Sequence, residues 1–227
     1  NPGATFRGLH DSLVNYGGNT APESILCTHE EIAVAIAHGY AVATGRPMAA
    51  AVHNIVGLLH ASMGIFNAWE DRMPVLVLGG TGPMATEQRR PWIDWIHTAN
   101  VQGEAVRNFV KWDDQPASVG SAVESLIRGY QITTSAPQGP VYICFDVATQ
   151  EQKLDEPFEM PDFSTFPNPT RLQADPEALG QAAELLVSAK KPVVIADFMG
   201  RSEDAAQGLV RLAESLSLPV ISGGDLY

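Results

Sequence analysis

The chain has 227 residues, of which 45% are hydrophobic and 18% are charged, a composition typical of a folded globular protein. Its formal net charge of −12 argues against nucleic acids and anionic membranes as partners, because both bind basic surfaces. We find no signal peptide and no apolar run long enough to span a bilayer, so we expect a cytoplasmic protein. The two cysteines, Cys27 and Cys144, lie in apolar runs, which predicts buried free thiols.

Apolar runs of strand length alternate with helical patterns after an opening turn at 1–4. Because a domain rarely begins on such a turn, we interpret the chain as lacking a leading helix and strand. The predicted strands are 24–27, 48–53, 74–78 and 141–145, and the predicted helices are 6–16, 32–43, 58–69, 92–99 and 117–133. This alternation predicts an α/β fold in which helices flank both faces of a parallel sheet.

The composition changes after Gln150, where a polar stretch at 151–170 carries four prolines and is typical of an extended linker. The alternation then resumes with predicted helices at 175–189 and 203–216 and predicted strands at 192–196 and 219–222. Two strands do not make a sealed core, so we expect an incomplete second α/β domain. The predicted boundaries are 1–148 for a first domain truncated at its N-terminus, 149–170 for the linker and 171–227 for the partial second domain.

The stretch 23–47 reads as a short strand, a tight turn and a buried helix that ends at Gly45. Thr28 is the predicted N-cap, and Glu31 completes a capping box with it. Glu30 has no such task and follows a strand end, where parallel sheets bind their ligands. A carboxylate buried there costs free energy unless it is paired, so we predict that Glu30 is functional. The alternative is a solvated acid that only complements the helix dipole.

Other catalytic and binding motifs do not fit the sequence. His29 has no second histidine four residues later, no close cluster of metal ligands stands out, and we predict no metal site. The glycine-rich run 79–82 is followed by Pro83 instead of a helix start, which argues against a phosphate loop. Arg89 and Arg90 could bind a carboxylate, or could remain solvated in a surface loop.

The order His29-Glu30, Gly39-Tyr40-Ala41 and Thr44-Gly45 resembles the N-terminal pyrimidine-binding domain of thiamine-diphosphate enzymes, in particular the acetolactate synthase and benzoylformate decarboxylase group. Similar segments follow in the same order, namely Val52-His53, Asn67-Ala68-Trp69, Pro74-Val75-Leu76-Val77, Val110-Lys111-Trp112 and Ala136-Pro137-Gln138-Gly139-Pro140. The segments 191–194 and 218–221 resemble the opening of the middle domain in that family.

This resemblance implies a thiamine-diphosphate-dependent decarboxylase or carboligase that acts on a small 2-oxo acid. Glu30 would hydrogen-bond N1′ of the aminopyrimidine and favour the imino tautomer, which takes the C2 proton of the thiazolium. For this role the carboxyl group must hold a proton near neutral pH. We expect apolar surroundings from Ile25, Ile32 and Val34 to raise its pKa against the opposing helix N-terminus.

The resemblance implies roles for five further residues. His53 matches a histidine of the benzoylformate decarboxylase group that faces the substrate and shuttles protons, and a purely structural histidine is the alternative. Asn54 and Gly57 would lie in a turn near the cofactor, or would serve only that turn. Pro2 and Gly3 would approach the pyrimidine from a neighbouring loop.

The family binds Mg²⁺ and the diphosphate through a C-terminal domain with a Gly-Asp-Gly start, which Gly223-Gly224-Asp225 does not match. The cofactor of the family lies between subunits, so the resemblance also implies a homodimer or homotetramer. A non-catalytic relative or regulatory subunit that keeps the fold is the alternative, and the presence of Glu30 argues against it. An ordinary dinucleotide-binding protein is disfavoured because no strand is followed by a Gly-x-Gly-x-x-Gly turn.

Overall fold

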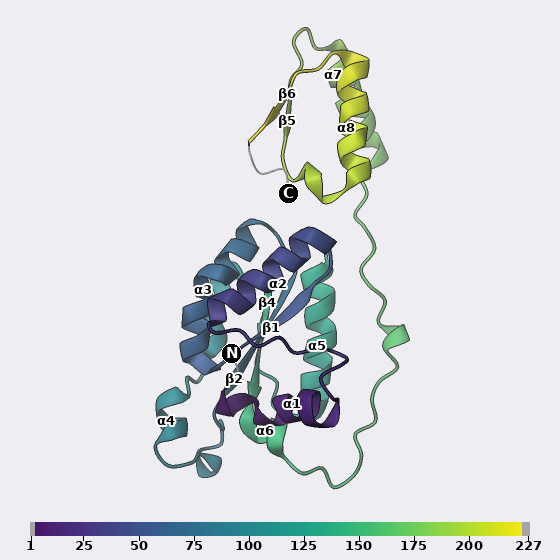
Figure 1. The fold of residues 1–227 in the computed structure, drawn as a ribbon. Coiled ribbons are helices and arrows are strands. Elements are labelled where there is room, and N and C mark those ends of the chain that lie inside the picture. The colour runs from purple at the N-terminus through teal and green to yellow at the C-terminus, as the bar shows by residue number, and fades with distance from the viewer. Residues whose placement is uncertain (1–2, 224–227) are drawn as a thin grey trace. The chain divides into compact units, whose positions relative to one another are not determined.

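A computed structural model describes residues 3–223. The chain divides into two compact units, unit 1 (Asn1–Thr170) and unit 2 (Arg171–Tyr227). Within residues 3–223, each unit has its own parallel sheet, with four strands in unit 1 and two in unit 2. Figure 1 shows the ribbon of both units. Among the described residues, no helix combines the length and the apolar character needed to cross a membrane.

The sheet of unit 1 has the strand order β1-β2-β4-β3, and all neighbouring strands are parallel. The strands are β1 (Met48–Val52), β2 (Val75–Thr81), β3 (Asp113–Asp114) and β4 (Val141–Asp146). β2 pairs Val77 with Ala50 of β1 and with Tyr142 of β4. The predicted parallel α/β sheet is therefore confirmed, although the two-residue strand β3 was not predicted.

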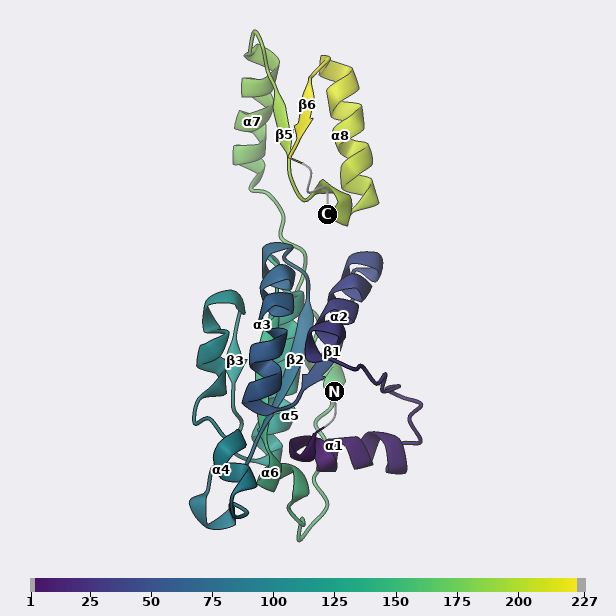
Figure 2. The same cartoon turned by 60° about the vertical axis from the view of Figure 1, so that its left-hand side comes forward.

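The alternation of side chains along β4 builds a core on each face of this sheet. Tyr142 and Cys144 pack with the helices α2 (Glu30–Thr44) and α3 (Asn54–Glu70), which lie side by side in Figure 2. Ile143 and Phe145 pack on the opposite face, with Phe6 at the N-terminal end of the chain. The helices α1 (Arg7–Asp11) and α5 (Val119–Thr134) belong to that second face.

The remaining elements are short or belong to unit 2. Unit 1 also contains α4 (Ile93–His97), α6 (Val147–Glu151), a π-helical turn at Ser12–Tyr16 and five 3-10 turns at Ala4–Phe6, Thr86–Gln88, Gln102–Ala105, Arg107–Phe109 and Phe163–Thr165. Unit 2 contains α7 (Pro176–Ser188), β5 (Val194–Ala196), a 3-10 turn at Met199–Arg201, α8 (Glu203–Leu216) and β6 (Val220–Ser222). β5 and β6 pair in parallel, in agreement with the predicted restart of the alternation.

The predicted strand at 24–27 is wrong. Within the described part of the chain this segment forms no strand, and Ile25 and Leu26 are 60% and 76% exposed. It lines a cavity of about 530 Å³ together with β1 and α1. A strand needs a neighbour that completes its backbone hydrogen bonds, and a local apolar run does not reveal whether that neighbour is present.

The predicted start of α2 is also wrong. His29 is the N-cap, the helix begins at Glu30, and no side chain caps it, so Thr28 and Glu31 form no capping box. The helix is also not buried throughout as predicted, because Ile32 is 39% exposed. The helix ends as predicted at Gly45, which has a φ of 67°. The buried residues form one stripe, namely Glu30, Val34, Ala37 and Ala41.

The helix α3 begins earlier than predicted. Residues 54–57 form its first turn instead of a separate loop, with His53 as the N-cap. This earlier start places Asn54 and Gly57 inside the helix, where both are buried. The end of β1 is therefore followed at once by the N-terminus of α3.

Both cysteines are free and buried, as predicted. Burial raises the pKa of the Cys144 thiol to about 12. We therefore expect Cys144 to resist a thiol reagent such as Ellman's reagent in the native chain at mildly alkaline pH, because only the thiolate reacts. Comparison of native and urea-unfolded protein measures this, and mapping by mass spectrometry identifies the residue. Rapid labelling of Cys144 in the native state would contradict the expectation.

Candidate active site

Glu30 is buried at the start of α2, with 8% of its surface exposed. Its Oε2 atom accepts a hydrogen bond from His60 Nδ1 at 3.0 Å. A Cβ atom at Gly57 would lie 3.0 Å from Glu30 Cγ and 3.1 Å from Oε1. The first turn of α3 therefore approaches the carboxylate closely because residue 57 has no side chain.

The surroundings of Glu30 differ from the predicted apolar ones. Of the three predicted apolar neighbours, Val34 is fully buried, but Ile25 and Ile32 are 60% and 39% exposed. The basic residue His60, in addition, contacts the carboxylate. The hydrogen bond with Glu30 raises the pKa of His60 above its ordinary value, an effect that burial opposes. Glu30 thus lies next to a proton donor that the sequence analysis did not identify.

His53 is held at both ring nitrogens. Asn54 Oδ1 accepts the Val56 backbone N–H at 3.0 Å, which turns the amide NH₂ group toward His53 Nε2 at 3.1 Å. Because an amide NH₂ only donates, Nε2 accepts and the ring proton lies on Nδ1, 3.1 Å from Thr5 Oγ1. Burial and then the neighbouring His97 lower the pKa of His53. The ring is therefore neutral at about pH 7.

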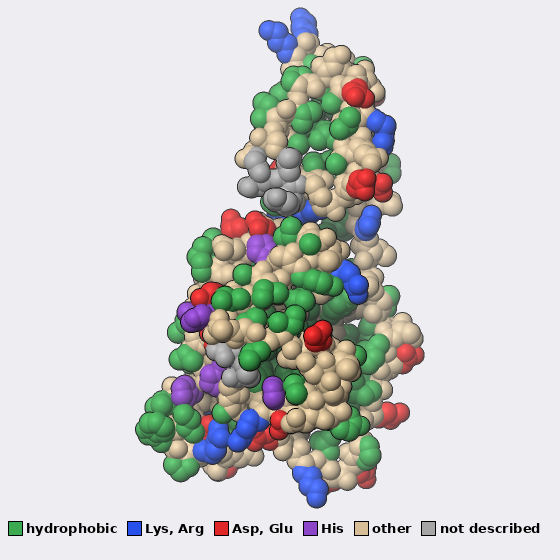
Figure 3. Space-filling model, viewed as in Figure 1, with side chains coloured by type: hydrophobic (Ala, Val, Ile, Leu, Met, Phe, Trp, Pro, Cys, Tyr) green, Lys and Arg blue, Asp and Glu red, His purple; other side chains and the backbone are tan. Residues whose placement is uncertain are grey.

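The predicted site residues meet where β1 ends and α2 and α3 begin. The charge of Glu30 raises the pKa of His53, a smaller effect than burial, and so the two residues are electrostatically coupled. Gly3 lies against His53, since a Cβ at residue 3 would be 2.0 Å from His53 Nδ1. Pro2 lies outside the described residues. Figure 3 shows several histidine side chains on the surface of unit 1.

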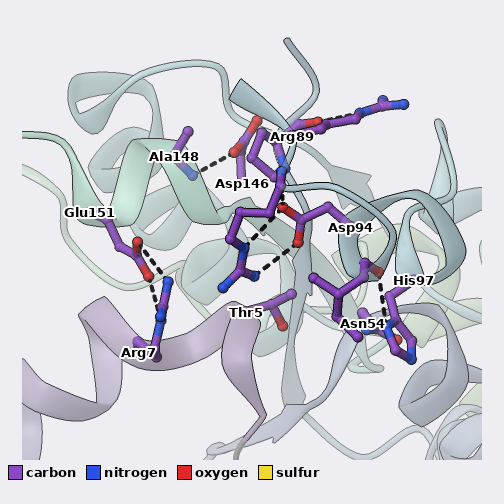
Figure 4. Close-up of polar contacts among 12 residues, drawn as sticks. Thr5, Arg7, Asn54, Arg89, Asp94, His97, Asp146, Ala148 and Glu151 are labelled. Carbon is purple, nitrogen blue, oxygen red and sulfur yellow. Dashed lines mark hydrogen bonds and ion pairs between the residues drawn. The ribbon is translucent and has the colours of Figure 1, made fainter. Parts of the chain in front are cut away.

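Asp94 makes polar contacts within the segment that also carries Arg89 and His97 (Figure 4). Its side chain is 3% exposed and accepts hydrogen bonds from the Arg90 backbone N–H at 2.8 Å and from the Arg90 guanidinium at 2.9 and 3.1 Å. The helix α4 that contains Asp94 also carries His97, whose ring centroid is 5.9 Å from that of His53. Asp94 therefore supports the segment that approaches His53.

The two arginines considered for carboxylate binding have internal partners. Arg90 pairs with Asp94. Arg89 Nε donates to the Pro83 carbonyl at 2.7 Å, and its guanidinium lies 4.9 Å from the Trp95 ring centroid. In these positions both side chains stabilise the loop at 83–95.

Comparison with known proteins identifies the family of the segment that carries this site. Residues 1–105 match the family model described as thiamine pyrophosphate enzyme, N-terminal TPP binding domain. This match supports a thiamine pyrophosphate-dependent enzyme family for these residues. The predicted family is thereby confirmed, and the family segment contains both Glu30 and His53.

Curated relatives extend the similarity along the chain. The acetolactate synthase large subunit of Haemophilus influenzae is 26% identical over 223 residues, which cover 97% of this chain and 37% of the relative. Benzoylformate decarboxylase of Pseudomonas aeruginosa is 28% identical over 226 residues, which cover 93% of this chain and 41% of the relative. The chain thus spans about two fifths of the length of these thiamine pyrophosphate enzyme relatives.

Solved structures share the fold. A benzoylformate decarboxylase from Polynucleobacter necessarius superposes with a TM-score of 0.81 at 24% identity, over 98% of this chain and 39% of that chain. A thiamine diphosphate-dependent 4-hydroxybenzoylformate decarboxylase from Rhodococcus jostii gives a TM-score of 0.79 at 20% identity. Both similarities support the α/β architecture of the thiamine pyrophosphate enzyme segment.

Sequence reasoning missed two residues of the site, His60 and Thr5. His60 follows His53 by seven residues and Gly57 by three, so all three share one face of a helix. This spacing was a usable signal, but the predicted turn at 54–57 concealed it. Thr5 contacts His53 across 48 residues, and no local pattern indicates such a contact.

Proposed function

We propose that this chain is the N-terminal part of a thiamine-diphosphate-dependent decarboxylase or carboligase that acts on a 2-oxo acid. The family match and the curated relatives support this proposal. The single observation that carries it is the burial of Glu30 at the start of α2, within the family segment. The same proposal implies a homo-oligomer and Mg²⁺ bound outside this chain.

The described residues fit the aminopyrimidine half of the cofactor. Glu30 offers a carboxylate at the ligand-binding edge of the sheet, and the missing side chain of Gly57 lets the first turn of α3 lie close to it. When bound, the cofactor supplies the nucleophilic carbon that attacks the carbonyl group of a 2-oxo acid. Glu30 would hold the proton that the pyrimidine ring nitrogen shares.

His53 would act on the substrate side of the same site. Asn54 and Thr5 fix its tautomer, and its lowered pKa keeps the imidazole neutral at about pH 7. A neutral imidazole accepts and releases a proton in this pH range, as proton transfer to or from a bound acid requires. Gly3 would define the wall beside this ring.

An activity assay of an intact enzyme that contains this chain tests the proposal. We expect Glu30→Gln to lower kcat with pyruvate or benzoylformate by about 10²-fold, because positioned proton transfer contributes on this order. Glu70→Gln is the matched control, since Glu70 is an exposed acid at the far end of α3, and its kcat is expected to remain unchanged. Full activity of the Glu30→Gln enzyme, with thiamine diphosphate and Mg²⁺ present, would refute the assignment.

A further inference from the structure

Three potential metal ligands meet beside the proposed cofactor site. One ligand atom from each of His29, Glu31 and His60 lies within 4.8 Å of the other two. His29 is the N-cap of α2, Glu31 is the second residue of that helix, and His60 lies on the neighbouring helix α3. The sequence analysis predicted no such cluster, because His60 is about 30 residues from the other two along the chain.

The donor atoms suit a borderline-soft divalent ion. Two imidazoles and one carboxylate are ligands that Zn²⁺ binds at about 2.0–2.2 Å, with a further position left for water. A tetrahedral ion needs ligand atoms about 3.4 Å apart, by the geometry of those bond lengths. The rings of His29 and His60 lie edge to face with centroids 5.4 Å apart, and both residues are exposed. Because both rings are exposed, side-chain rotation has room to close the three donor atoms from their present spacing of up to 4.8 Å.

The charges around His60 also favour a cation. His60 Nδ1 lies 3.0 Å from Glu30 Oε2 and 3.0 Å from Glu31 Oε2. The single N–H group at this nitrogen is hydrogen-bonded to Glu30, and the buried Oε2 atom of Glu31 makes no hydrogen bond. An ion of charge +2 would satisfy this oxygen and balance both carboxylates. The two acids also offset the positive end of the α2 dipole.

We propose that His29, Glu31 and His60 form a binding site for a divalent transition-metal ion of the Zn²⁺ class. His29 and Glu31 have no role in the proposed function, and His60 has none beyond its hydrogen bond to Glu30, so the two proposals can fail separately. Glu30 is not a ligand of the proposed ion, but its carboxylate lies 3.0 Å from His60 Nδ1 and adds negative charge near the site. An ion bound to His60 would replace the hydrogen bond between His60 and Glu30.

Metal titration of the 227-residue chain tests the site. The protein is treated with a chelator, dialysed, and titrated with Zn²⁺ against a chromophoric indicator at neutral pH. We expect one Zn²⁺ per chain, and at least a tenfold loss of affinity for each of His29→Ala, Glu31→Gln and His60→Gln. His10→Gln is the matched control, because His10 is an exposed histidine whose Nδ1 lies 3.5 Å from Asp11, and its affinity is expected to equal that of the unaltered chain.

A second probe reports the ligands directly. Co²⁺ in place of Zn²⁺ is expected to give visible absorption typical of low coordination with nitrogen ligands, and each of the three variants is expected to lose it. Far-UV circular dichroism checks that every variant is folded. Failure of the unaltered chain to bind stoichiometric Zn²⁺ would overturn the proposal. Undiminished affinity in folded His29→Ala or His60→Gln would overturn it as well.

Discussion

Replacement of Gly79 with alanine is expected to lower the free energy of unfolding of unit 1 by about 3–5 kcal/mol. Gly79 lies in β2, between β1 and β4, and an added Cβ would be 1.9 Å from Tyr142 Oη. Tyr142 is fully buried and donates a hydrogen bond to Gln102 Oε1 at 3.1 Å, and Gln102 is also fully buried. The new methyl group must therefore displace a buried ring and break its hydrogen bond.

Urea unfolding followed by far-UV circular dichroism measures this loss. Gly39→Ala is the matched control, because Gly39 lies on the exposed side of α2 and a Cβ there would meet no atom within 4 Å. The free energy of unfolding of this control is expected to rise by about 0.5–1 kcal/mol, since alanine favours the helix more than glycine does. A Gly79→Ala protein as stable as the unaltered chain would contradict the described packing of Tyr142.

Removal of the buried charge at residue 94 is expected to have the second largest effect. We expect Asp94→Asn to lower the free energy of unfolding by about 3 kcal/mol at neutral pH, because the Arg90 guanidinium and backbone N–H both bind this carboxylate. The hydrogen bond from Arg90 lowers the pKa of Asp94, and burial opposes this. Glu104→Gln is the control, since the ion pair of Glu104 with Arg107, at 3.6 Å, is exposed. This variant is expected to lose about 0.5 kcal/mol or less of the free energy of unfolding.

The sign of the pH dependence follows from the lowered pKa of Asp94. The carboxylate stabilises the folded state fully above its ordinary pKa of 3.8 and loses this contribution as the pH falls through the lower folded value. The difference in stability between the unaltered chain and Asp94→Asn is therefore expected to shrink on acidification below about pH 4. Urea titrations at several acidic pH values measure it, and a difference that grows under acid would contradict the assignment.

Sequence patterns predicted the architecture well where they are local. Short apolar runs indicated β1, β2 and β4, because all three strands read as continuous apolar segments; β2 and β4 are buried almost throughout, whereas β1 is buried only at Ala50 and Val52. The two-residue strand β3 carries Asp113 and Asp114 and has no such signal. The strand prediction at 24–27 is wrong because this segment is apolar but has no strand partner among the described residues.

Site residues that follow from the local sequence could be predicted, whereas those that depend on contacts between distant segments could not. Glu30 was predicted to be buried from its place in the first turn of an apolar helix just past a strand end; it is buried, although the strand predicted at 24–27 is absent from the described residues. His60, in contrast, reaches Glu30 across 30 residues, and Asp94 is buried on the five-residue helix α4, which is too short for a periodic pattern to indicate its buried side. These contacts depend on how α2, α3 and the loop pack, and a single sequence does not encode that packing in any local pattern. The proposed roles of Glu30 and His53 stay predictions until the variants are measured.

The division into two units determines what an optical probe can see. All four tryptophans, Trp69, Trp92, Trp95 and Trp112, lie in unit 1. Intrinsic indole emission therefore reports on the first sheet and its helices alone, whereas backbone ellipticity sums over both units. A melting step that appears in the ellipticity without a change in emission would belong to the segment after Arg171, and no label need be introduced to tell the two apart.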